Sequence, residues 1–248
     1  MRFEGKSALV TGASEGIGFA IAAALVREGA RVVLVAQREE KLAEAARKLG
    51  PRASIVVGDV GEASCARRAV AETVARHGGL DLLVNNAGIL LPGKMGDHPL
   101  DHLDRMLAVN LRGTVLFTDA AVGPMTGRPG AAILLISSCA ARSPAPTATV
   151  YGATKAAQNY LAGAWAVELA PAGIRVNTLC PGPTDTPAMD AAARAIPGLL
   201  ESNIETNLIK RIGTSEEVAE IALTLLDERL SGYVTGAVWN IDGGNRLS

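Results

Sequence analysis

Short apolar runs rich in β-branched residues alternate along the chain with longer Ala- and Leu-rich segments in which apolar positions recur at helical spacing. This alternation is typical of strand-helix-strand units around a buried parallel sheet, because strands that are covered on both faces have few polar positions. The pattern predicts seven strands, at residues 7–11, 32–36, 53–57, 82–85, 131–137, 175–180 and 238–241.

The segments between these strands predict six helices, at residues 16–28, 39–49, 62–76, 100–125, 151–169 and 215–226. No Pro- or Ser-rich linker, repeat or low-complexity block interrupts the pattern. We therefore expect residues 1–248 to form a single α/β domain of Rossmann-like, doubly wound type, with a seven-stranded parallel sheet and helices on both faces. The long irregular segment 181–211 carries several prolines, and its length favours a substrate lid over about 187–212.

Charge and composition restrict the expected partners. The formal net charge is -1 and the Lys and Arg residues are scattered, which is unlike a surface that binds nucleic acid or anionic membranes. No apolar run approaches the roughly 20 residues of a membrane-spanning helix, and the start lacks the apolar core of a signal peptide. The three cysteines include no Cys-x-x-Cys pair and the three histidines lie in polar segments, so no metal site is expected. We expect a cytoplasmic protein whose partner is a small molecule.

A glycine-rich segment follows the first predicted strand directly and opens into the first predicted helix. It contains Gly12, Gly16 and Gly18, with Ser14 and Ile17 between them. Glycines allow a tight turn and a close approach of a pyrophosphate, whose charge is then stabilised by free N–H groups at the helix N-terminus. A glycine triplet alone equally fits a plain tight turn, but its position between strand and helix favours dinucleotide binding.

Residues after the second and third strands bear on which dinucleotide binds. NAD-specific proteins carry an acidic residue at the end of the second strand, where this chain has an alanine followed by Gln37 and Arg38. The missing carboxylate and the guanidinium of Arg38 favour NADP. Glu15, in the glycine-rich segment, would repel a 2′-phosphate and leaves NAD as the alternative. Asp59, followed by Val60, fits either a contact to the adenine amino group or a cap for the next helix.

A second group of residues suits proton transfer. Tyr151 and Lys155 are four residues apart at the start of a predicted helix, so their side chains share one face. A phenol has a pKa of about 10, which an adjacent ammonium and a cationic nicotinamide would lower toward neutrality. Ser138 ends the fifth strand, where its hydroxyl suits donation to a substrate carbonyl or to local backbone. Asn110, among apolar residues of a helix, is either functional or a buried structural amide.

Taken together, these residues resemble the short-chain dehydrogenase/reductase family in its compact form, and the resemblance extends over nearly the whole chain. The family motifs occur in order and at the expected spacing: Thr11-Gly12-x-x-x-Gly16-x-Gly18, Asp59, Asn85-Asn86-Ala87-Gly88, Asn110, Ser138, Tyr151-x-x-x-Lys155 and Pro181-Gly182. The resemblance implies a bound nicotinamide dinucleotide, with NADP favoured and NAD as the alternative. It also implies a seven-stranded sheet and a homotetramer in which the 100–125 and 151–169 helices pair between subunits.

The resemblance assigns roles to individual residues. Tyr151 would be the acid/base, Ser138 would orient the substrate oxygen, and Lys155 would hold the nicotinamide ribose and lower the pKa of Tyr151. Asn110 would position a water that links Lys155 to solvent. Further contacts to the cofactor are implied for Asn86, Ala87, Gly88, Pro181, Gly182, Thr184 and Thr186.

The expected function is hydride transfer between a nicotinamide and a carbonyl or secondary alcohol, with three alternatives. The first is reduction of 3-oxoacyl groups on an acyl carrier protein, for which family members present arginines where this chain has Pro129 and Ala172, with Arg128 as a partial substitute. The second is a non-enzymatic dinucleotide-binding regulator, against which an intact tetrad argues. The third is dehydration or epimerisation with a tightly held nucleotide that is not consumed.

Overall fold

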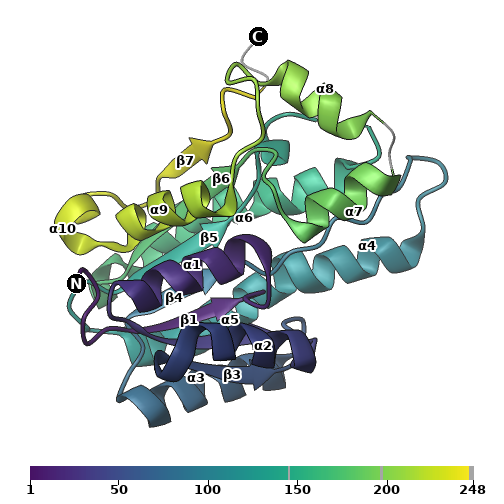
Figure 1. Ribbon diagram of the computed structural model, residues 1–248. Coiled ribbons are helices and arrows are strands. Elements are labelled where there is room, and N and C mark those ends of the chain that lie inside the picture. Colours follow the sequence, from purple (N-terminus) through teal and green to yellow (C-terminus); the bar gives the residue numbers. More distant parts are fainter. Residues whose placement is uncertain (145, 196–197, 246–248) are drawn as a thin grey trace.

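The computed structural model of the protein describes residues 1–144, 146–195 and 198–245. Its centre is a parallel sheet that has, within these residues, seven strands in the order β3-β2-β1-β4-β5-β6-β7 (Figure 1). The strand bounds agree with the sequence prediction to within one residue at each end. They are β1 (Ser7–Thr11), β2 (Arg31–Ala36), β3 (Ala53–Val57), β4 (Leu82–Asn85), β5 (Ala132–Ile136), β6 (Arg175–Pro181) and β7 (Val238–Ile241).

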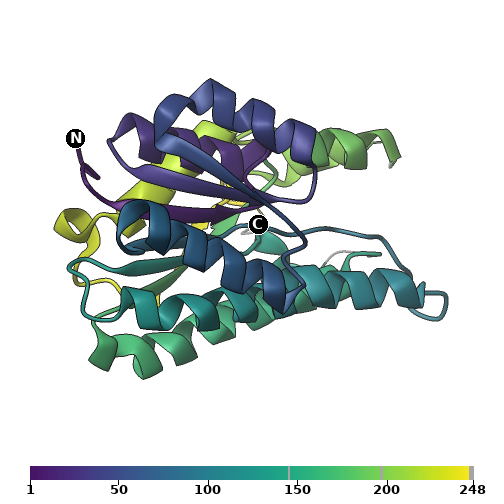
Figure 2. The same ribbon diagram turned by 90° about the horizontal axis from the view of Figure 1, so that it is seen from below.

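Helices cover both faces of the sheet, as the sequence predicts. One face carries α1 (Gly16–Arg27), α2 (Glu39–Leu49) and α9 (Ser215–Leu226), and the other carries α3 (Ala63–His77), α5 (Gly113–Met125) and α6 (Thr149–Leu169). Figure 2 shows the two layers with the sheet between them. The short helix α10 (Glu228–Ser231) follows α9. The protein therefore has the Rossmann-like, doubly wound architecture that the alternation of apolar runs indicates.

The inner strands, such as β1, β4 and β5, have almost no polar positions because apolar helices cover both faces of the sheet there. Successive residues of a strand point to opposite faces. In β1, Ala8 and Val10 pack into the core cluster that contains α1 and α9, whereas Leu9 packs into the cluster that contains α3 and α5. All three residues are fully buried, which accounts for the continuous apolar run in the sequence.

The predicted helix over residues 100–125 is not regular. It consists of α4 (Leu100–Met106), a π-helical segment (Leu107–Arg112) and α5. A π-helical turn inserts an extra residue into the helix and changes which backbone groups bond to one another, and such turns are frequent at functional sites. The segment contains Asn110, so the irregularity lies at a residue that the sequence marks as a candidate.

The expectation of an irregular stretch over residues 181–211 is wrong in part. It contains α7 (Pro187–Ala195) and α8 (Leu199–Thr206). Pro187 is the first residue of α7, where the missing N–H of proline costs no helical hydrogen bond. The prolines of this segment were taken to indicate an irregular chain, whereas Pro187 begins a helix. Of the predicted lid at about 187–212, residues 196–197 lie outside the described residues.

The order of the strands locates the ligand-binding edge. From β1 the chain adds β2 and β3 in one direction and then, from β4 onward, builds in the other. In sheets of this type ligands bind beside the carboxyl ends of the strands where the order reverses, here between β1 and β4. The glycine-rich segment after β1 and Asn86 after β4 both lie at this point. Within the described ranges, every helix is too short or too polar to cross a lipid bilayer.

Candidate active site

The glycine-rich loop between β1 and α1 has a shape that side chains would not tolerate. Gly12 and Gly16 have φ angles of +64° and +58°, in the left-handed region that favours glycine. A Cβ atom on Gly18 would lie 2.4 Å from both the Asn86 amide nitrogen and the Gly12 carbonyl oxygen. Ser14 and Ile17 are half-buried in the same loop and first turn. The loop thus brings backbone N–H groups to the N-terminus of α1, as pyrophosphate binding requires.

Asn86, which the resemblance places along the cofactor, holds this loop in position. Its side-chain amide donates to the carbonyl oxygens of Thr11 at 2.9 Å and Gly12 at 3.2 Å. In return, the Thr11 hydroxyl accepts from the backbone N–H groups of Asn86 and Ala87, both at 3.0 Å. These bonds join the end of β1 to the end of β4 across the switch point.

Arg38 and Glu15, the two residues with opposite implications for the dinucleotide, form an ion pair. Lys41 joins them from the first turn of α2, with its Nζ 2.8 Å from Glu15 Oε2. Partial burial raises the pKa of Glu15, but hydrogen bonds from Lys41 and Arg38 outweigh it and hold that pKa below its usual range. Sequence reasoning missed Lys41, although its position three residues after Arg38 on a predicted helix was a usable signal. Two cations therefore converge where a 2′-phosphate would bind.

Asp59, after β3, is ion-paired and caps no helix. Arg105 of α4 donates to its Oδ2 at 2.6 Å, and the Gly61 N–H donates to its Oδ1 at 2.8 Å. Partial burial raises the pKa of Asp59, but these bonds and one from Gln37 outweigh it and hold that pKa below its usual range. Val60 beside it is buried. The cap alternative is wrong, because α3 begins at Ala63 without a side-chain cap; an adenine contact stays a prediction.

Ser138 and Tyr151 meet beyond the carboxyl end of β5. The Ser138 Oγ accepts from the Ala140 N–H at 3.1 Å, at the start of a short 3₁₀ turn (Cys139–Ala141), and its own O–H is a hydrogen-bond partner of the Tyr151 phenol. Burial nevertheless raises the pKa of Tyr151 to about 12. The phenol therefore carries its proton at neutral pH in this structure.

Lys155 is buried one turn further along α6, with a relative exposure of 3%. Its Nζ donates to the Ile136 carbonyl at 2.8 Å and to Gln158 Oε1 at 3.1 Å, and lies 5.8 Å from the centroid of the Tyr151 ring. Burial lowers the pKa of Lys155 to about 8. Burial dominates the pKa of Tyr151 in the protein alone, and the lowering expected from this ammonium together with a cationic nicotinamide stays a prediction.

Asn110 is fully buried, and its side chain makes three hydrogen bonds within the protein. Its amide oxygen accepts from the Ile89 N–H at 2.8 Å, and its amide nitrogen donates to the Ile89 carbonyl at 2.9 Å and to the Thr154 hydroxyl at 3.1 Å. Its side chain thus fixes the loop after β4 against α6. Gly88 lies in that loop, and a Cβ there would be 3.1 Å from Lys155 Nζ and 3.6 Å from Asn110 Oδ1.

The residues after β6 complete the edge. A Cβ on Gly182 would lie 2.6 Å from the Asp242 Cα, so only glycine fits where the chain leaves Pro181. The Thr184 hydroxyl donates to the Gly182 carbonyl at 2.9 Å, and the Thr186 hydroxyl accepts from the Met189 N–H at 3.1 Å at the start of α7. A Cβ on Gly16 would be 3.3 Å from Thr186 Cγ2, so this segment packs against the glycine-rich loop.

Arg128 is not available at the site. Its guanidinium donates to Asp81 at 2.8 Å, directly before β4 and thus at the amino-terminal edge of the sheet. Asp81 is 2% exposed, and although burial raises its pKa, hydrogen bonds from Arg128 and Ser7 outweigh that effect and lower it. The idea that Arg128 substitutes for arginines at a pocket mouth is therefore wrong, because it neutralises a buried carboxylate.

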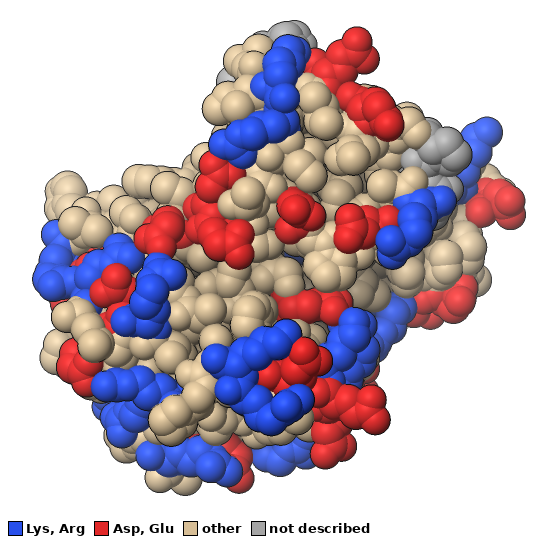
Figure 3. Space-filling view, in the orientation of Figure 1, with Lys and Arg blue, Asp and Glu red and all other residues tan. Residues whose placement is uncertain are grey.

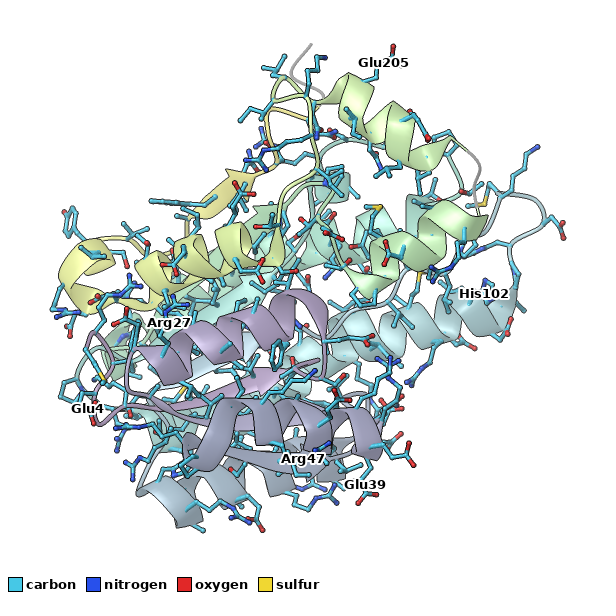
Figure 4. All side chains as sticks on the ribbon, in the orientation of Figure 1. Glu4, Arg27, Glu39, Arg47, His102 and Glu205 are labelled. Carbon is cyan, nitrogen blue, oxygen red and sulfur yellow. The ribbon has the colours of Figure 1, made fainter. Side chains whose placement is uncertain are left out.

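The described residues contain neither a metal-binding cluster nor, on the face shown in Figure 3, a broad basic patch. Among the described residues, no three His, Cys, Asp or Glu side chains gather closely enough to hold a metal ion. His102 lies on the outer side of α4 (Figure 4), where its Nδ1 is 2.9 Å from the Pro92 carbonyl oxygen. On the face shown in Figure 3, Lys and Arg side chains are interspersed with Asp and Glu. Cys65 and Cys180 are buried and Cys139 is partly exposed, and none of these three forms a disulfide within the described residues.

The fold and the glycine-rich loop together define a dinucleotide-binding protein of the Rossmann type. A family model described as "Enoyl-(Acyl carrier protein) reductase" matches residues 12–246. An uncharacterised oxidoreductase of Thermotoga maritima is 37% identical over 99% of both chains, and dehydrogenase/reductase SDR family member 4 of Bos taurus is 38% identical over 98% of this chain and 88% of its own length. The chain belongs to the short-chain dehydrogenase/reductase family and is an oxidoreductase of that family.

Solved structures agree with this assignment. A short-chain dehydrogenase from Burkholderia cenocepacia in complex with NADP is 33% identical, with a TM-score of 0.92 and full coverage of both chains. A mutant short-chain dehydrogenase/reductase from Serratia marcescens is 36% identical, with a TM-score of 0.91 over 98% of this chain and 99% of its own. These similarities support a nicotinamide cofactor for this protein.

Proposed function

We propose that the protein transfers hydride between a nicotinamide dinucleotide and a carbonyl or secondary alcohol, with Tyr151 as the acid/base. The observation that carries the proposal is the convergence of Ser138, Tyr151 and Lys155 at the carboxyl edge of β5. The Ser138 hydroxyl contacts the phenol, and Lys155 Nζ lies 5.8 Å from the phenol ring. A protein that only bound a dinucleotide would have no use for a phenol and a hydroxyl placed together there.

The proposed chemistry divides between the cofactor and these side chains. A bound nicotinamide supplies or accepts the hydride at the substrate carbon. In reduction, the Ser138 hydroxyl donates to the carbonyl oxygen and Tyr151 delivers the proton to it; in oxidation, the Tyr151 phenolate takes the proton from the alcohol. Lys155 provides a positive charge that stabilises the phenolate and an N–H group for the nicotinamide ribose. Asn110 fixes the loop that carries Gly88 beside Lys155.

The loop and strand ends fit a dinucleotide, and we propose NADP as the preferred one over NAD. Gly12, Gly16 and Gly18 form a cradle that Cβ atoms would fill. Arg38 and Lys41 supply two cations for a 2′-phosphate. The NADP complex of the Burkholderia cenocepacia relative supports this choice. The remaining proposed contacts come from Ser14, Ile17, Gln37, Asp59, Val60, Asn86, Ala87, Gly88, Pro181, Gly182, Thr184 and Thr186.

We propose a free small molecule as substrate, covered by a lid over about residues 187–212. Reduction of a 3-oxoacyl group on an acyl carrier protein is the second candidate, favoured by the description of the matching family model. Arg128 is the one cation that the sequence suggested for binding an acidic carrier protein. It is bonded to the buried Asp81 and is therefore not available for that role. The small-molecule proposal is therefore preferred.

We further propose a cytoplasmic homotetramer. A reducing compartment suits Cys65, Cys139 and Cys180, since none of them forms a disulfide in the described part of the chain. Exposed apolar side chains line the helices that would pair between subunits, which is typical of a surface covered in an assembly. They are Leu107 of the π-helical segment, Val115 of α5, and Tyr160 and Val167 of α6, the last two 79% and 77% exposed.

The test is oxidation of NADPH and NADH against a panel of small carbonyls, with Tyr151→Phe as the control variant. We expect turnover by the natural sequence and a loss of about 10²- to 10⁴-fold in kcat for the variant, because the acid/base proton is removed while the packing of the ring is kept. Binding of NADPH without turnover of any carbonyl would favour a regulator. A copurifying nucleotide that is regenerated without net consumption would favour dehydration or epimerisation.

A further inference from the structure

Gln158 is a buried polar residue at the centre of the site that neither the motifs nor the proposed chemistry uses. It lies three residues after Lys155 on α6, on the same side of the helix, and is fully buried. Its Oε1 accepts from Lys155 Nζ at 3.1 Å. Its Nε2 donates to the Asn110 carbonyl at 2.7 Å and to the Thr114 hydroxyl at 2.9 Å.

The chemistry of the partners fixes the orientation of this amide. An ammonium only donates hydrogen bonds and a carbonyl only accepts them, so the amide must turn its oxygen to Lys155 and its nitrogen to Asn110. The reverse orientation would place a donor against a donor and an acceptor against an acceptor. Gln158 therefore joins the two residues in one defined way.

The Asn110 backbone carbonyl already accepts two hydrogen bonds from side chains. It accepts from the Gln158 amide and, at 2.8 Å, from the Thr114 hydroxyl, which together use its two lone pairs. The carbonyl lies in the π-helical segment, where the altered backbone pattern brings it toward α6. An amide side chain thus stands between Asn110 and Lys155.

We propose that Gln158 is a positioning residue that fixes the Lys155 ammonium through a direct amide bridge to Asn110. The proposal rests on the oxidoreductase function proposed above. Two N–H bonds of Lys155 are held, by the Ile136 carbonyl and by Gln158, and the third is left for the side of Gly88, where the ribose would lie. The charge that stabilises the Tyr151 phenolate is thereby kept in one place.

The bridge also stabilises the charged form of Lys155. Burial lowers the pKa of Lys155 to about 8, and a neutral acceptor oxygen favours the ammonium over the amine. The other titratable groups that act on this pair are Cys180 of β6, which acts on both side chains, and Cys139 of the 3₁₀ turn, which acts on Tyr151. Neither thiol changes when Gln158 is replaced.

The test replaces Gln158 with Met, which keeps the volume and removes the acceptor, and with Glu, which keeps an acceptor oxygen facing Lys155. The first measurement is the pKa of Lys155 by ¹³C NMR of lysine-labelled, cofactor-free protein, with the Lys155 signal assigned from Lys155→Met. We expect Gln158→Met to lower this pKa by roughly one unit and Gln158→Glu not to lower it.

The second measurement is the pH profile of alcohol oxidation with saturating cofactor. A less charged Lys155 stabilises the phenolate less, so Gln158→Met should move the acid limb of kcat to higher pH and lower kcat at neutral pH by roughly three- to tenfold, with KM nearly unchanged. The matched control is Thr118→Val, which removes another buried hydrogen bond on α5, the one from Asn85 at 3.0 Å, without touching Lys155.

The outcomes separate this proposal from the proposed function. An unchanged Lys155 pKa in Gln158→Met, or the same shift in Thr118→Val, overturns the positioning role even if the enzyme is active. Absence of turnover in the natural protein overturns the proposed function, while the NMR titration still decides whether Gln158 sets the protonation of Lys155. A loss of activity in Gln158→Met without any movement of the pH profile indicates a structural role only and also overturns the proposal.

Discussion

The ion-paired cluster of Glu15, Arg38 and Lys41 leads to a prediction about cofactor preference. Glu15 occupies the two cations that would bind a 2′-phosphate, so NADP has to displace a carboxylate from them. Replacing Glu15 with Gln removes the competing charge and keeps the shape of the side chain. We expect tighter binding of NADPH and little change for NADH, which has no phosphate at this position.

The magnitude follows from the exposure of the cluster. The three side chains are 32%, 53% and 49% exposed, so the dielectric around them is close to that of water. Two unit charges about 5 Å apart then repel by roughly 1 kcal/mol, and salt reduces this further. That energy corresponds to a decrease of about fivefold in the Kd for NADPH. The two exposed ion pairs are each worth only about 0–1 kcal/mol, so the stability of the fold should change little.

The assay is a fluorescence titration of the substrate-free protein with NADPH and with NADH at fixed ionic strength, repeated at high salt. Arg38→Ala and Lys41→Ala are the matched variants, and each should weaken NADPH binding while leaving NADH nearly unaffected. Equal effects of Glu15→Gln on the two nicotinamides would refute the assignment of this cluster to the 2′-phosphate. The assignment would also be refuted if the effect of Glu15→Gln on NADPH binding did not decrease at high salt.

Two further predictions concern the glycine-rich loop and Lys155. Gly18→Ala places a methyl group 2.4 Å from the Asn86 amide nitrogen and the Gly12 carbonyl oxygen, so it should destabilise the fold by roughly 1–3 kcal/mol and abolish dinucleotide binding. Thermal unfolding with and without NADPH measures both effects, and retained binding would contradict the tight loop. Any stability advantage of Lys155→Met over the natural protein should be largest at pH 7, because the folded pKa of about 8 lies below the unfolded value of about 10.4; it is reduced because the Ile136 carbonyl and Gln158 Oε1 lose their donor. Between these two pKa values the unfolded chain binds more protons than the folded one, so the stability of the natural protein rises with pH and the advantage of the variant should shrink. An unchanged difference in unfolding free energy between the two proteins from about pH 7 to 10.5 would contradict the reasoning.

The inner strands, such as β1, β4 and β5, were predictable from the sequence because they are buried on both faces, and burial on both faces leaves an almost unbroken apolar run. Helices with one exposed face, such as α2, were predictable because their buried residues recur at helical spacing among polar ones. The π-helical segment around Asn110 was not predictable, since its residues have the same apolar spacing as a regular helix. The start of α7 at Pro187 was not predictable either, because proline marks both a break and a first helical turn.

The candidate residues were identifiable wherever the chemistry depends on a local motif. Gly12, Tyr151 and Lys155 are of this kind, since neighbours along the chain determine their spacing. Gln158 and Lys41 act through contacts between elements far apart in the sequence, Gln158 with the π-helical segment 48 positions earlier and Lys41 with the loop 26 positions earlier. Arg128 was assigned a role that it does not have. Its position in the sequence, next to Pro129, gave no indication that it neutralises the buried carboxylate of Asp81.

The bonds between Thr11 and Asn86 join the glycine-rich loop to the loop after β4, the two loops that we propose bind the phosphates and border the nicotinamide. β1 and β4 are neighbours in the sheet, and the Asn86 amide reaches the two carbonyls at the end of β1. A Cβ on Gly12 or Gly18 would meet that same amide, so the glycines are required by the crossing of the two loops as well as by any ligand. Displacement of Asn86 would therefore loosen both the phosphate loop and the segment from Ala87 to Gly88 that faces Lys155.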